Sequence, residues 1–401
     1  MKILFLSYDT VDKGVRDQVT YSFIEKEMKA LSEAGHSIYY LSRNLRESIK
    51  PDKVHYLSMS DLLAESRARA YIRVLLLVLF NPMILARLAL VNRHRALHAL
   101  VCEAGVFLAC KKYHIEIIHT HFLWPAGLSA VLSATQLGIP VVATLRGAEL
   151  VSLPEFDYGS MRDPFFRVST KFSFKKISAF STPNRYYRTK LLDEHGVPES
   201  RIRYLPNGVE RIDVDSYSHE KDPEYLQLIS VGRLIKLKNH TQILHAMALL
   251  KERRIKLTIV GVGDELASLT REVELLGLTG LVSVESEMEK QALLQKFASS
   301  DCLVHASYSE GMPNVVLESL ALGVPCLVSD IPVHRELIRN GENGWIFELD
   351  SPDRLAELLQ RVLINRSRFR QMRENCVLST KGYALEAKIA GYNSIYRTLT
   401  A

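Results

Sequence analysis

The sequence predicts an α/β protein built from two doubly wound parallel sheets that face each other across a cleft. Short apolar runs alternate with amphipathic helical stretches along the chain, which is the pattern of βα units. A length of 401 residues exceeds what one hydrophobic core usually supports. The alternation breaks over residues 207–223, where Gly, Asp, Ser, His and Lys replace the periodic apolar residues, so we expect a domain boundary there.

The individual elements follow from the same patterns. The strands predicted in the first half are Ile3–Ser7, Ser37–Leu41, Ile115–His119, Val141–Thr144, Ala179–Thr182 and Ile202–Leu205. A helix is predicted over Val19–Ala34 because Gly35 follows as a C-terminal cap. The strands predicted in the second half are Leu226–Val231, Lys256–Val260, Leu281–Val284, Cys302–His305, Cys326–Ser329 and Trp345–Phe347. The helices predicted between them are His240–Lys251, Glu265–Gly277, Lys290–Ser299 and Asn314–Leu322.

These elements form two Rossmann-like domains. We expect an N-terminal domain over residues 1–212, a C-terminal domain over 213–380, and a final helix over 381–401 that packs back toward the first domain. In open parallel sheets, ligands bind at the carboxyl ends of the strands, so functional side chains are sought there.

Composition indicates an ordinary globular protein in a reducing compartment. Hydrophobic residues make up 47% of the chain and charged residues 24%. The five cysteines form no CxxC pair, and no Cys/His cluster has metal-ligand spacing, so free thiols and no bound metal are expected. The N-terminal apolar run is too short for a signal peptide. We therefore expect a cytoplasmic protein, with possible peripheral attachment to the inner face of a membrane.

The positive charge is concentrated in the first half. Residues 1–215 hold 29 Lys and Arg against 22 Asp and Glu, whereas residues 216–401 hold 22 against 23. No basic tract with interleaved aromatic residues occurs, which argues against nucleic acid as the partner. An anionic membrane surface fits the basic half better.

One apolar segment interrupts the βα pattern. Tyr71–Val91 is nearly all apolar, but Arg73 and Arg87 lie within it and Asn81-Pro82 breaks the run between them, so the segment is too short to span a bilayer. Basic residues flank it on both sides. Two readings stay open: helices that lie in a membrane interface, or a pair of buried core helices.

The most informative segment is Ser309–Glu318, with two glutamates eight positions apart. Pro313 suits the first turn of a helix, whose free amide groups and dipole attract anions. Glu310 would lie in the loop before that helix, while Glu318 lies inside an apolar run where a carboxylate needs partners. The spacing would let one carboxylate meet a sugar and the other a ribose, with a diphosphate between them.

Two further loops of the second half follow predicted strands. Arg233 and Lys238 would project from the first loop toward a diphosphate, which an Arg fork and a Lys charge can bind and stabilise as it leaves. The second loop contains Gly261 and Gly263, but Leu266 takes the third glycine position of a dinucleotide motif. It is better interpreted as a tight turn that lets a bound group approach the backbone.

Two residues of the first half lie just past predicted strand ends. His121 and Arg146 could therefore reach the cleft, whereas His119 is assigned a structural role. No nucleophile elbow and no Walker loop occurs in the sequence, which argues against a hydrolase or a P-loop enzyme.

With these motifs in place, the chain resembles the retaining glycosyltransferases of the GT-B fold, in glycosyltransferase family four. The resemblance covers nearly the whole chain. It is most specific in Glu310…Glu318 and the following Ala321–Pro325, and is supported by Gly232–Lys238, Val260–Gly263 and Leu205–Val209 in the expected order.

The resemblance implies a nucleotide-diphosphate sugar as donor substrate and no cofactor or metal. Glu310 would bind donor-sugar hydroxyls, Glu318 the ribose, and Arg233 with Lys238 the diphosphate. The remaining donor contacts would come from Gly263, Gly311, Met312, Pro313 and Asn314. His121 and Arg146 would join the catalytic set, and the acceptor would be a glycan or a lipid-linked molecule of a cell-surface polysaccharide pathway. Transfer would retain the anomeric configuration by front-face departure.

The sequence departs from the family pattern in two places. Residues 9–16 hold a single glycine where many relatives have a Gly-Gly loop, and Arg146 stands where many have His. Two alternatives remain. One is a GT-B epimerase or phosphorylase, for which the sequence offers no supporting residues, and the other is an inactive sugar-nucleotide-binding or scaffold subunit.

Overall fold

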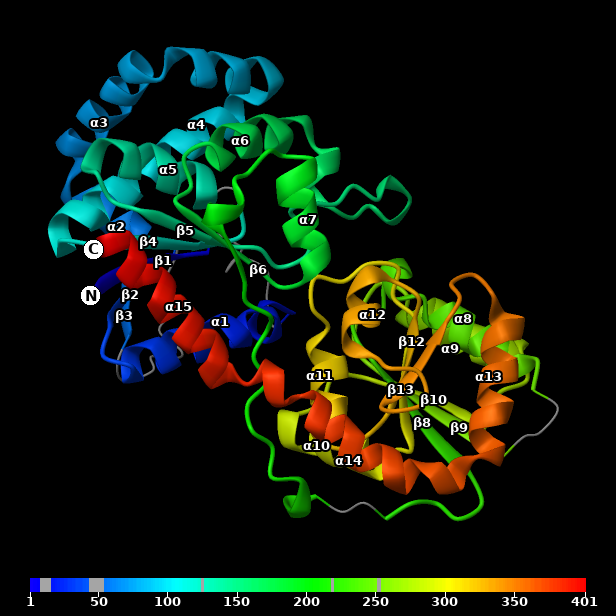
Figure 1. Cartoon of the computed structure of the whole chain (residues 1–401). Helices are drawn as coiled ribbons and strands as arrows, with labels where there is room; N and C mark the ends of the chain where they lie inside the picture. The colour runs from blue at the N-terminus through cyan, green and yellow to red at the C-terminus, as the bar shows by residue number, and fades with distance from the viewer. Residues whose placement is uncertain (8–15, 43–53, 124–125, 218–219, 251–253) are drawn as a thin grey trace. The chain divides into compact units, whose positions relative to one another are not determined.

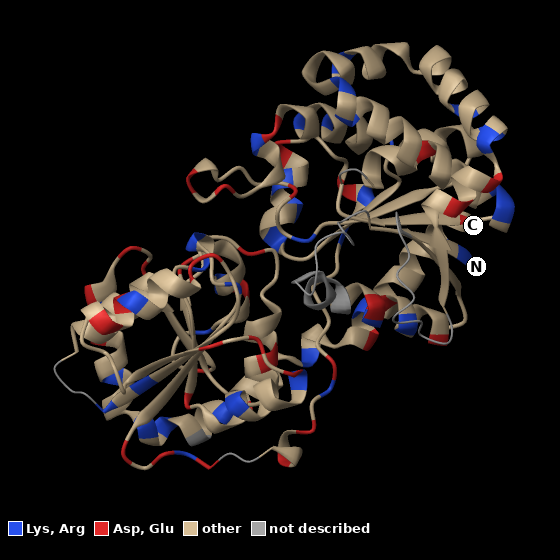
Figure 2. Ribbon diagram, turned by 180° about the vertical axis from the view of Figure 1, so that it is seen from behind, with Lys and Arg blue, Asp and Glu red and all other residues tan. Residues whose placement is uncertain are grey.

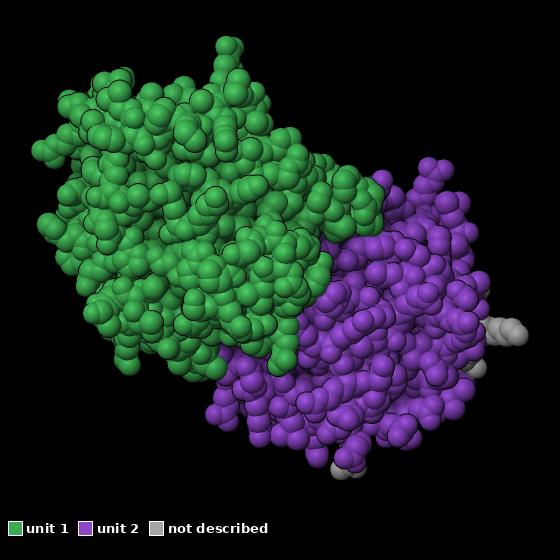
Figure 3. Space-filling model, turned by 45° about the horizontal axis from the view of Figure 1, so that its top comes forward, with its two compact units in different colours: residues 1–206, 386–401 green, residues 207–385 purple. Residues whose placement is uncertain are grey.

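Figure 1 shows a computed structural model of the chain, which describes residues 1–7, 16–42, 54–123, 126–217, 220–250 and 254–401. The chain forms two compact units (Figure 3). Unit 1 comprises residues 1–206 and 386–401, and unit 2 comprises residues 207–385. The boundaries predicted from the sequence were after residues 212 and 380. Each unit contains one sheet in which all strand pairs are parallel, so the predicted α/β class is confirmed.

The sheet of unit 1 has seven strands in the order β3-β2-β1-β4-β5-β6-β7. They are β1 Lys2–Leu6, β2 Ser37–Ser42, β3 Val54–Ser58, β4 Ile117–His121, β5 Val141–Thr144, β6 Ala179–Thr182 and β7 Ile202–Tyr204. The first strand lies inside the sheet, and the strand order reverses between β1 and β4. That reversal is the point where doubly wound sheets bind their ligands.

Helices cover both faces of this sheet (Figure 1). They are α1 Arg16–Glu33, α2 Met59–Glu65, α3 Arg67–Phe80, α4 Pro82–Tyr113, α5 Ala126–Leu137, α6 Pro164–Phe174, α7 Arg185–Asp193 and α15 Leu385–Thr400. Every residue of β4 and β5 is buried, as expected for central strands of a parallel sheet.

Two strand predictions in this unit are corrected. β3 was not predicted at all. β4 runs over Ile117–His121 rather than Ile115–His119, because its register with β1 begins at Ile117 opposite Ile3. His121 is therefore the last residue of a strand, paired with Thr144 of β5, rather than a residue beyond the strand end.

The apolar segment Tyr71–Val91 forms two helices that meet at a sharp corner. α3 ends at Phe80 and α4 begins at Pro82, where proline suits a first helical position. The axes of α3 and α4 differ in direction by 99°. Within the described residues no single helix has the length and hydropathy of a membrane span, although the bent pair meets that test when its two helices are taken together.

α4 is itself broken at Asn92, whose φ of −162° and ψ of 103° are not helical. The side chain of Asn92 accepts a hydrogen bond of 3.0 Å from the backbone N–H of Arg95. Asn92 thus acts as the N-cap of the second part of α4.

The sheet of unit 2 has six strands in the order β10-β9-β8-β11-β12-β13. They are β8 Leu226–Val231, β9 Ile255–Val260, β10 Val282–Glu285, β11 Cys302–His305, β12 Cys326–Ser329 and β13 Gly344–Phe347. The helices are α8 His240–Ala248, α9 Leu266–Leu275, α10 Lys290–Ser299, α11 Asn314–Ala321, α12 Pro332–Leu337, α13 Pro352–Ile364 and α14 Phe369–Ser379. The predictions for β8, β11 and β12 are confirmed residue for residue.

The helix predicted after the Glu310 loop is α11. Pro313 is its N-cap residue, and Gly323 follows the helix with a φ of +71°, a conformation that favours glycine. The final helix is α15, and its residues from Glu386 onward belong to unit 1. There the hydroxyl of Tyr396 lies 2.6 Å from Nδ1 of His119.

Candidate active site

In unit 2, Glu310 lies at the centre of a cluster of polar side chains. Lys238 donates to Oε1 of Glu310 in an ion pair, and Nε2 of His305 lies 2.8 Å from the same oxygen. The side chains of Glu310 and Lys238 are 12% and 14% exposed, while His305 is buried. The carboxylate is therefore held by two partners and still reaches the surface.

The strand order explains why these residues meet. β8 and β11 are neighbours in the sheet, so the loop after β8, which carries Lys238, lies beside the loop after β11, which carries Glu310. Two hydrogen bonds join the loops: the backbone N–H of Tyr308 donates to the carbonyl of Leu237 at 2.9 Å, and the side-chain hydroxyl of Ser307 donates to the same carbonyl at 3.3 Å.

The charge state of Glu310 follows from its neighbours. Burial by itself would raise the pKa of this carboxyl group, but the positive charge of Lys238 and the hydrogen bond from His305 outweigh burial and hold the pKa well below its usual range. Glu310 is therefore ionised at neutral pH. An ionised carboxylate only accepts hydrogen bonds, so His305 donates through Nε2–H.

His305 was not predicted as a site residue. It is the last residue of β11, five positions before Glu310, and its ring packs edge-on against His334 with centroids 5.4 Å apart. Burial lowers the pKa of His305, so the ring stays neutral despite the attraction of Glu310. A histidine that ends an otherwise apolar strand just before Glu310 was the signal in the sequence that could have identified it.

Both glycines of the loop after β9 lie against protein backbone, and the contact of Gly263 with a donor stays a prediction. A Cβ on Gly263 would lie 2.1 Å from the backbone oxygen of Leu234, and a Cβ on Gly261 would lie 1.9 Å from that of Gly232. These two glycines therefore allow the loop after β9 to pack against the loop after β8, and the group that approaches them is protein backbone. Arg233, in the loop after β8, has an exposed side chain.

The second glutamate, Glu318, lies on α11 and forms an ion pair with Lys290 of α10. Its side chain is 20% exposed, so it is accessible to a ligand. At the start of α11, the side-chain amide of Asn207 donates to Oδ1 of Asn314 at 2.8 Å and to the carbonyl of Met312 at 3.3 Å. These bonds hold the Gly311–Asn314 segment in which the helix begins.

A separate cluster of charged side chains lies in unit 1, at the carboxyl ends of β4 and β5. Arg146 donates to Oε2 of Glu27 at 2.6 Å, and the same Arg146 nitrogen lies 3.0 Å from Nδ1 of His121. Oε1 of Glu27 also pairs with Lys388 of α15 at 2.8 Å. All four side chains are buried. The 3.0 Å distance shows that the structure brings the predicted residues His121 and Arg146 into direct contact.

The electrostatics of this cluster are set by burial and by the ion pairs. Burial by itself would raise the pKa of Glu27, but Arg146 and Lys388 lower it to about 2. Burial and the charge of Arg146 lower the pKa of Lys388 to about 8. Burial lowers the pKa of His121 well below its ordinary value, so the ring is neutral.

The contact with Arg146 fixes the tautomer of His121. Arginine is always charged and only donates, so Nδ1 of His121 accepts and the ring proton lies on Nε2. Nε2 is buried and has no hydrogen-bond partner among the described residues. The cluster therefore holds a neutral N–H donor at the end of β4.

Two other predictions concern the loop of residues 9–16 and the absence of a bound metal. The loop of residues 9–16 with a single glycine lies outside the described residues, apart from the backbone of Arg16. Among the described residues, no group of three or more His, Cys, Asp or Glu side chains could hold a metal ion.

Comparison with protein families gives two matches along the chain. Residues 26–208 match the family model described as glycosyl transferase 4-like domain, and residues 212–377 match the one described as glycosyl transferases group 1. The chain belongs to the group 1 glycosyl transferases. The resemblance found in the sequence is thereby confirmed at the level of the family.

Individual glycosyltransferases are similar to this chain over much of its length. A D-inositol 3-phosphate glycosyltransferase from Nocardiopsis dassonvillei is 26% identical over 270 residues, which is 62% of this chain and 62% of that protein. The crystal structure of a glycosyltransferase from Rickettsia africae superposes with a TM-score of 0.73 at 17% identity, covering 99% of this chain and 98% of the other.

A third similar protein, HepE from Anabaena, was solved in complex with UDP. It gives a TM-score of 0.71 at 14% identity and covers 99% of this chain and 100% of its own. At these identities the two structures establish the GT-B fold for this group 1 glycosyl transferase and nothing finer.

Proposed function

We propose that the protein transfers a sugar from a nucleoside diphosphate sugar to a hydroxyl group of an acceptor, with the donor bound by unit 2. The observation that carries this proposal is the cluster of Glu310, Lys238 and His305 beside the start of α11. It combines an ionised carboxylate, a movable cation and the amide end of a helix, which suit sugar hydroxyls and a diphosphate.

Each side chain then has a distinct task. Glu310 accepts hydrogen bonds from donor-sugar hydroxyls, and Glu318 accepts them from the ribose. Arg233, which is exposed, and Lys238, on a flexible stem, bind the diphosphate and stabilise its charge as it leaves. His305 keeps Glu310 in place and is a positioning residue.

We further propose that transfer retains the configuration at the anomeric carbon and needs no metal. The bond from that carbon to the diphosphate oxygen breaks, the bond to the acceptor oxygen forms on the same face, and the departing diphosphate takes the acceptor proton. In this proposal Glu310 is a hydrogen-bond acceptor and not the nucleophile, because the contacts of Lys238 and His305 with its Oε1 lower the nucleophilicity of the carboxylate. The cations stabilise the leaving group in place of a metal.

For the substrates, the UDP complex of HepE supports a uridine nucleotide as the first donor to test. The inositol phosphate named for the Nocardiopsis relative supports a polar hydroxyl acceptor. We propose a glycan or lipid-linked acceptor of a cell-surface polysaccharide, met in the cytoplasm at the inner face of a membrane. The exposed apolar side chains of α3, such as Leu75 and Leu79, and the excess of Lys and Arg in the first half of the chain support an anionic membrane as partner.

The test is nucleotide release and product analysis with the purified full-length chain and UDP-, GDP- and ADP-sugars. Glu310→Gln should lower turnover at least about 100-fold, because it removes a charge-assisted contact to the reacting sugar. Glu274→Gln, on the exposed surface of α9, is the matched control and should keep full activity. The anomeric configuration of the product, read by NMR, tests retention separately.

Two outcomes would oppose the proposal. Full turnover in Glu310→Gln would reject the site. Nucleotide binding by the native protein with no transfer to any acceptor class would favour the alternative of an inactive sugar-nucleotide-binding subunit.

A further inference from the structure

The outer side of α3 and of the adjoining part of α4 is apolar and exposed. Of the eighteen large hydrophobic side chains that are exposed in the described part of the chain, twelve lie between residues 71 and 101. They form what we call the apolar face: Tyr71, Ile72, Leu75, Leu76, Val78, Leu79, Phe80, Met83, Leu90, Val91, Leu97 and Val101. Soluble monomers rarely expose an apolar patch of this extent, so the apolar face marks an interaction surface.

The core of unit 1 does not need these side chains. The inner side of the same helices is already apolar, and Leu77, Leu85 and Leu88 pack there against α5 and α6. A helix on the surface of a soluble protein carries polar residues on its outer side, whereas α3 is apolar on both sides. The reading of Tyr71–Val91 as a buried core pair is therefore wrong for its outer half.

The segment that carries the apolar face contains basic residues and no acidic ones. Residues 66–102 contain six arginines and two histidines and no Asp or Glu, and Figure 2 shows this stretch as tan and blue ribbon. Arg73 is turned inward and pairs with Glu103, and Arg95 pairs with Asp163. The other four are exposed and pair with no carboxylate among the described residues: Arg67, Arg69, Arg87 and Arg93.

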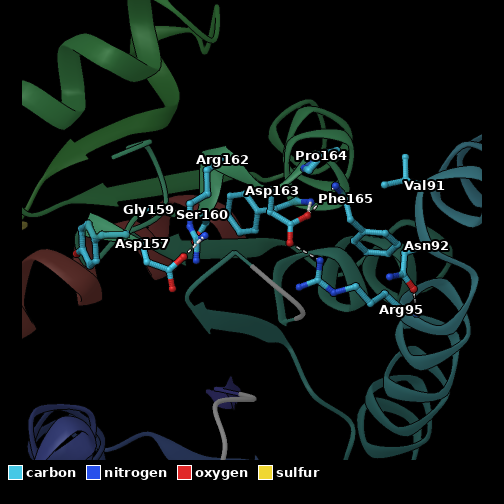
Figure 4. A pocket seen from close by; sticks show the side chains of 12 residues that line it. Val91, Asn92, Arg95, Asp157, Gly159, Ser160, Arg162, Asp163, Pro164 and Phe165 are labelled. Carbon is cyan, nitrogen blue, oxygen red and sulfur yellow. Dashed lines mark hydrogen bonds and ion pairs between the residues drawn. The ribbon is translucent and has the colours of Figure 1, made fainter. Parts of the chain in front are cut away.

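A pocket of about 560 Å³ beside the break in α4 does not account for this charge (Figure 4). Its two arginines already have partners, since Arg95 pairs with Asp163 and Arg162 with Asp157. The pocket is therefore electrically balanced, and the surplus positive charge lies on the exposed arginines around the apolar face.

We infer that the apolar face docks on an anionic lipid bilayer, with α3 and the start of α4 lying in the interface. Apolar side chains would enter the boundary between headgroups and acyl chains, while the exposed arginines meet anionic headgroups. The corner at Asn81-Pro82 places Phe80 and Met83, 69% and 73% exposed, at adjacent helix ends that can enter together. Charge complementarity selects the bilayer over a second copy of the chain, because two such faces would repel each other.

The inference rests on the membrane partner proposed above and assigns its docking surface. Docking is measured without donor or acceptor, so a failure to dock and a failure to transfer sugar are distinguished. The experiment is flotation of the full-length chain with phosphatidylcholine vesicles that contain or lack phosphatidylglycerol, at low and high salt. Flotation separates bound protein from aggregates, which sink. We expect binding to the anionic vesicles that weakens with salt, and little binding to the neutral ones.

Two variants and one control make the test specific. Leu75→Gln, Leu79→Gln and Phe80→Gln together should weaken partitioning about 1000-fold, because each substitution of an apolar side chain that is about two-thirds exposed loses about tenfold. The control combines Leu249→Gln, Leu275→Gln and Ile364→Gln, which alter equally exposed side chains of unit 2 and should leave partitioning unchanged.

The second variant, Arg67→Ala with Arg87→Ala, should weaken binding to anionic vesicles about 25-fold, at about fivefold for each arginine. Circular dichroism confirms that each variant is folded. No flotation at low salt, equal flotation with neutral vesicles, or equal losses in the unit 2 control would overturn the inference. A concentration-dependent oligomer abolished by the apolar triple variant, with no vesicle binding, would assign the face to self-association instead.

Discussion

The buried ion pairs of Glu27 allow a quantitative prediction about the stability of unit 1. In Glu27→Gln the shape of the side chain is nearly kept, but its charge is lost. Arg146 and Lys388 then remain buried and positively charged without their shared carboxylate. Removing one partner of a buried ion pair typically costs about 3–5 kcal/mol, because the remaining charge is uncompensated.

The pKa of Glu27 gives a second route to the same magnitude. Its carboxyl group titrates at about 2 in the fold against an ordinary value of 4.5. At about 1.4 kcal/mol for each pH unit, this difference corresponds to about 3 kcal/mol of stability. Because the folded pKa is the lower one, that stability is fully present above pH 4.5 and is lost as the pH falls toward 2.

The assay is hydrogen exchange read by mass spectrometry, with peptides that cover β4 and α15. Unit 1 is then followed separately from unit 2. At pH 7, Glu27→Gln should lower the free energy of opening in these peptides by about 3 kcal/mol. The control is Glu33→Gln, because Glu33 is exposed at the end of the same helix, and it should change that free energy by less than about 0.5 kcal/mol. In chemical denaturation at pH 4, the difference between Glu27→Gln and the native protein should shrink by about 1 kcal/mol.

A small effect would refute this reasoning. If Glu27→Gln changed the opening free energy at pH 7 by no more than the Glu33→Gln control, the two cations would not depend on Glu27. A difference that stayed constant between pH 7 and pH 4 would show that charge is not the cause of the destabilisation.

Three further predictions concern single side chains. NMR of nitrogen-labelled histidine should show His121 as the neutral Nε2–H tautomer, and the Arg146→Met variant should lose this preference; an unchanged tautomer would contradict the assigned donor. The pKa of Lys388 is lowered from 10.5 to about 8, so the unfolded chain binds this proton more tightly than the folded one. The native protein should therefore gain stability relative to Lys388→Met as the pH rises from 8 to 10.5. If the difference in unfolding free energy between the two proteins did not change with pH in chemical denaturation, the prediction would be contradicted. Gly263→Ala should cost about 1–3 kcal/mol in thermal unfolding because its Cβ meets backbone, whereas Gly382→Ala, which meets nothing within 4 Å, should cost less.

Much of the fold was determined by the sequence alone. Strands such as Leu226–Val231 and Cys302–His305 are short apolar runs between turn residues, and that local pattern suffices to place them. The start of α11 at Asn314 followed from Pro313, whose ring restricts the backbone in any context. The presence of both Glu310 and Glu318 in one short segment was likewise visible in the sequence.

The contacts of the site depended on the tertiary structure. Lys238 and Glu310 lie 72 positions apart, and they meet only because β8 and β11 are neighbours in the sheet. The same order places His305 against Glu310. In unit 1, the burial of Arg146 follows from α1 and α15, which bring Glu27 and Lys388 to it. Periodicity along the chain carries no information about which loops become neighbours.

The apolar segment Tyr71–Val91 marks the same limit most clearly. Its composition fits a core helix pair and an interfacial pair equally well, because a leucine has the same hydrophobicity wherever it lies. Only the packing of α3 and α4 on α5 and α6 decided which side is buried, leaving side chains such as Leu79 in solvent. The sequence therefore determined the elements and their chemistry, while tertiary packing decided which side chains meet and which remain exposed.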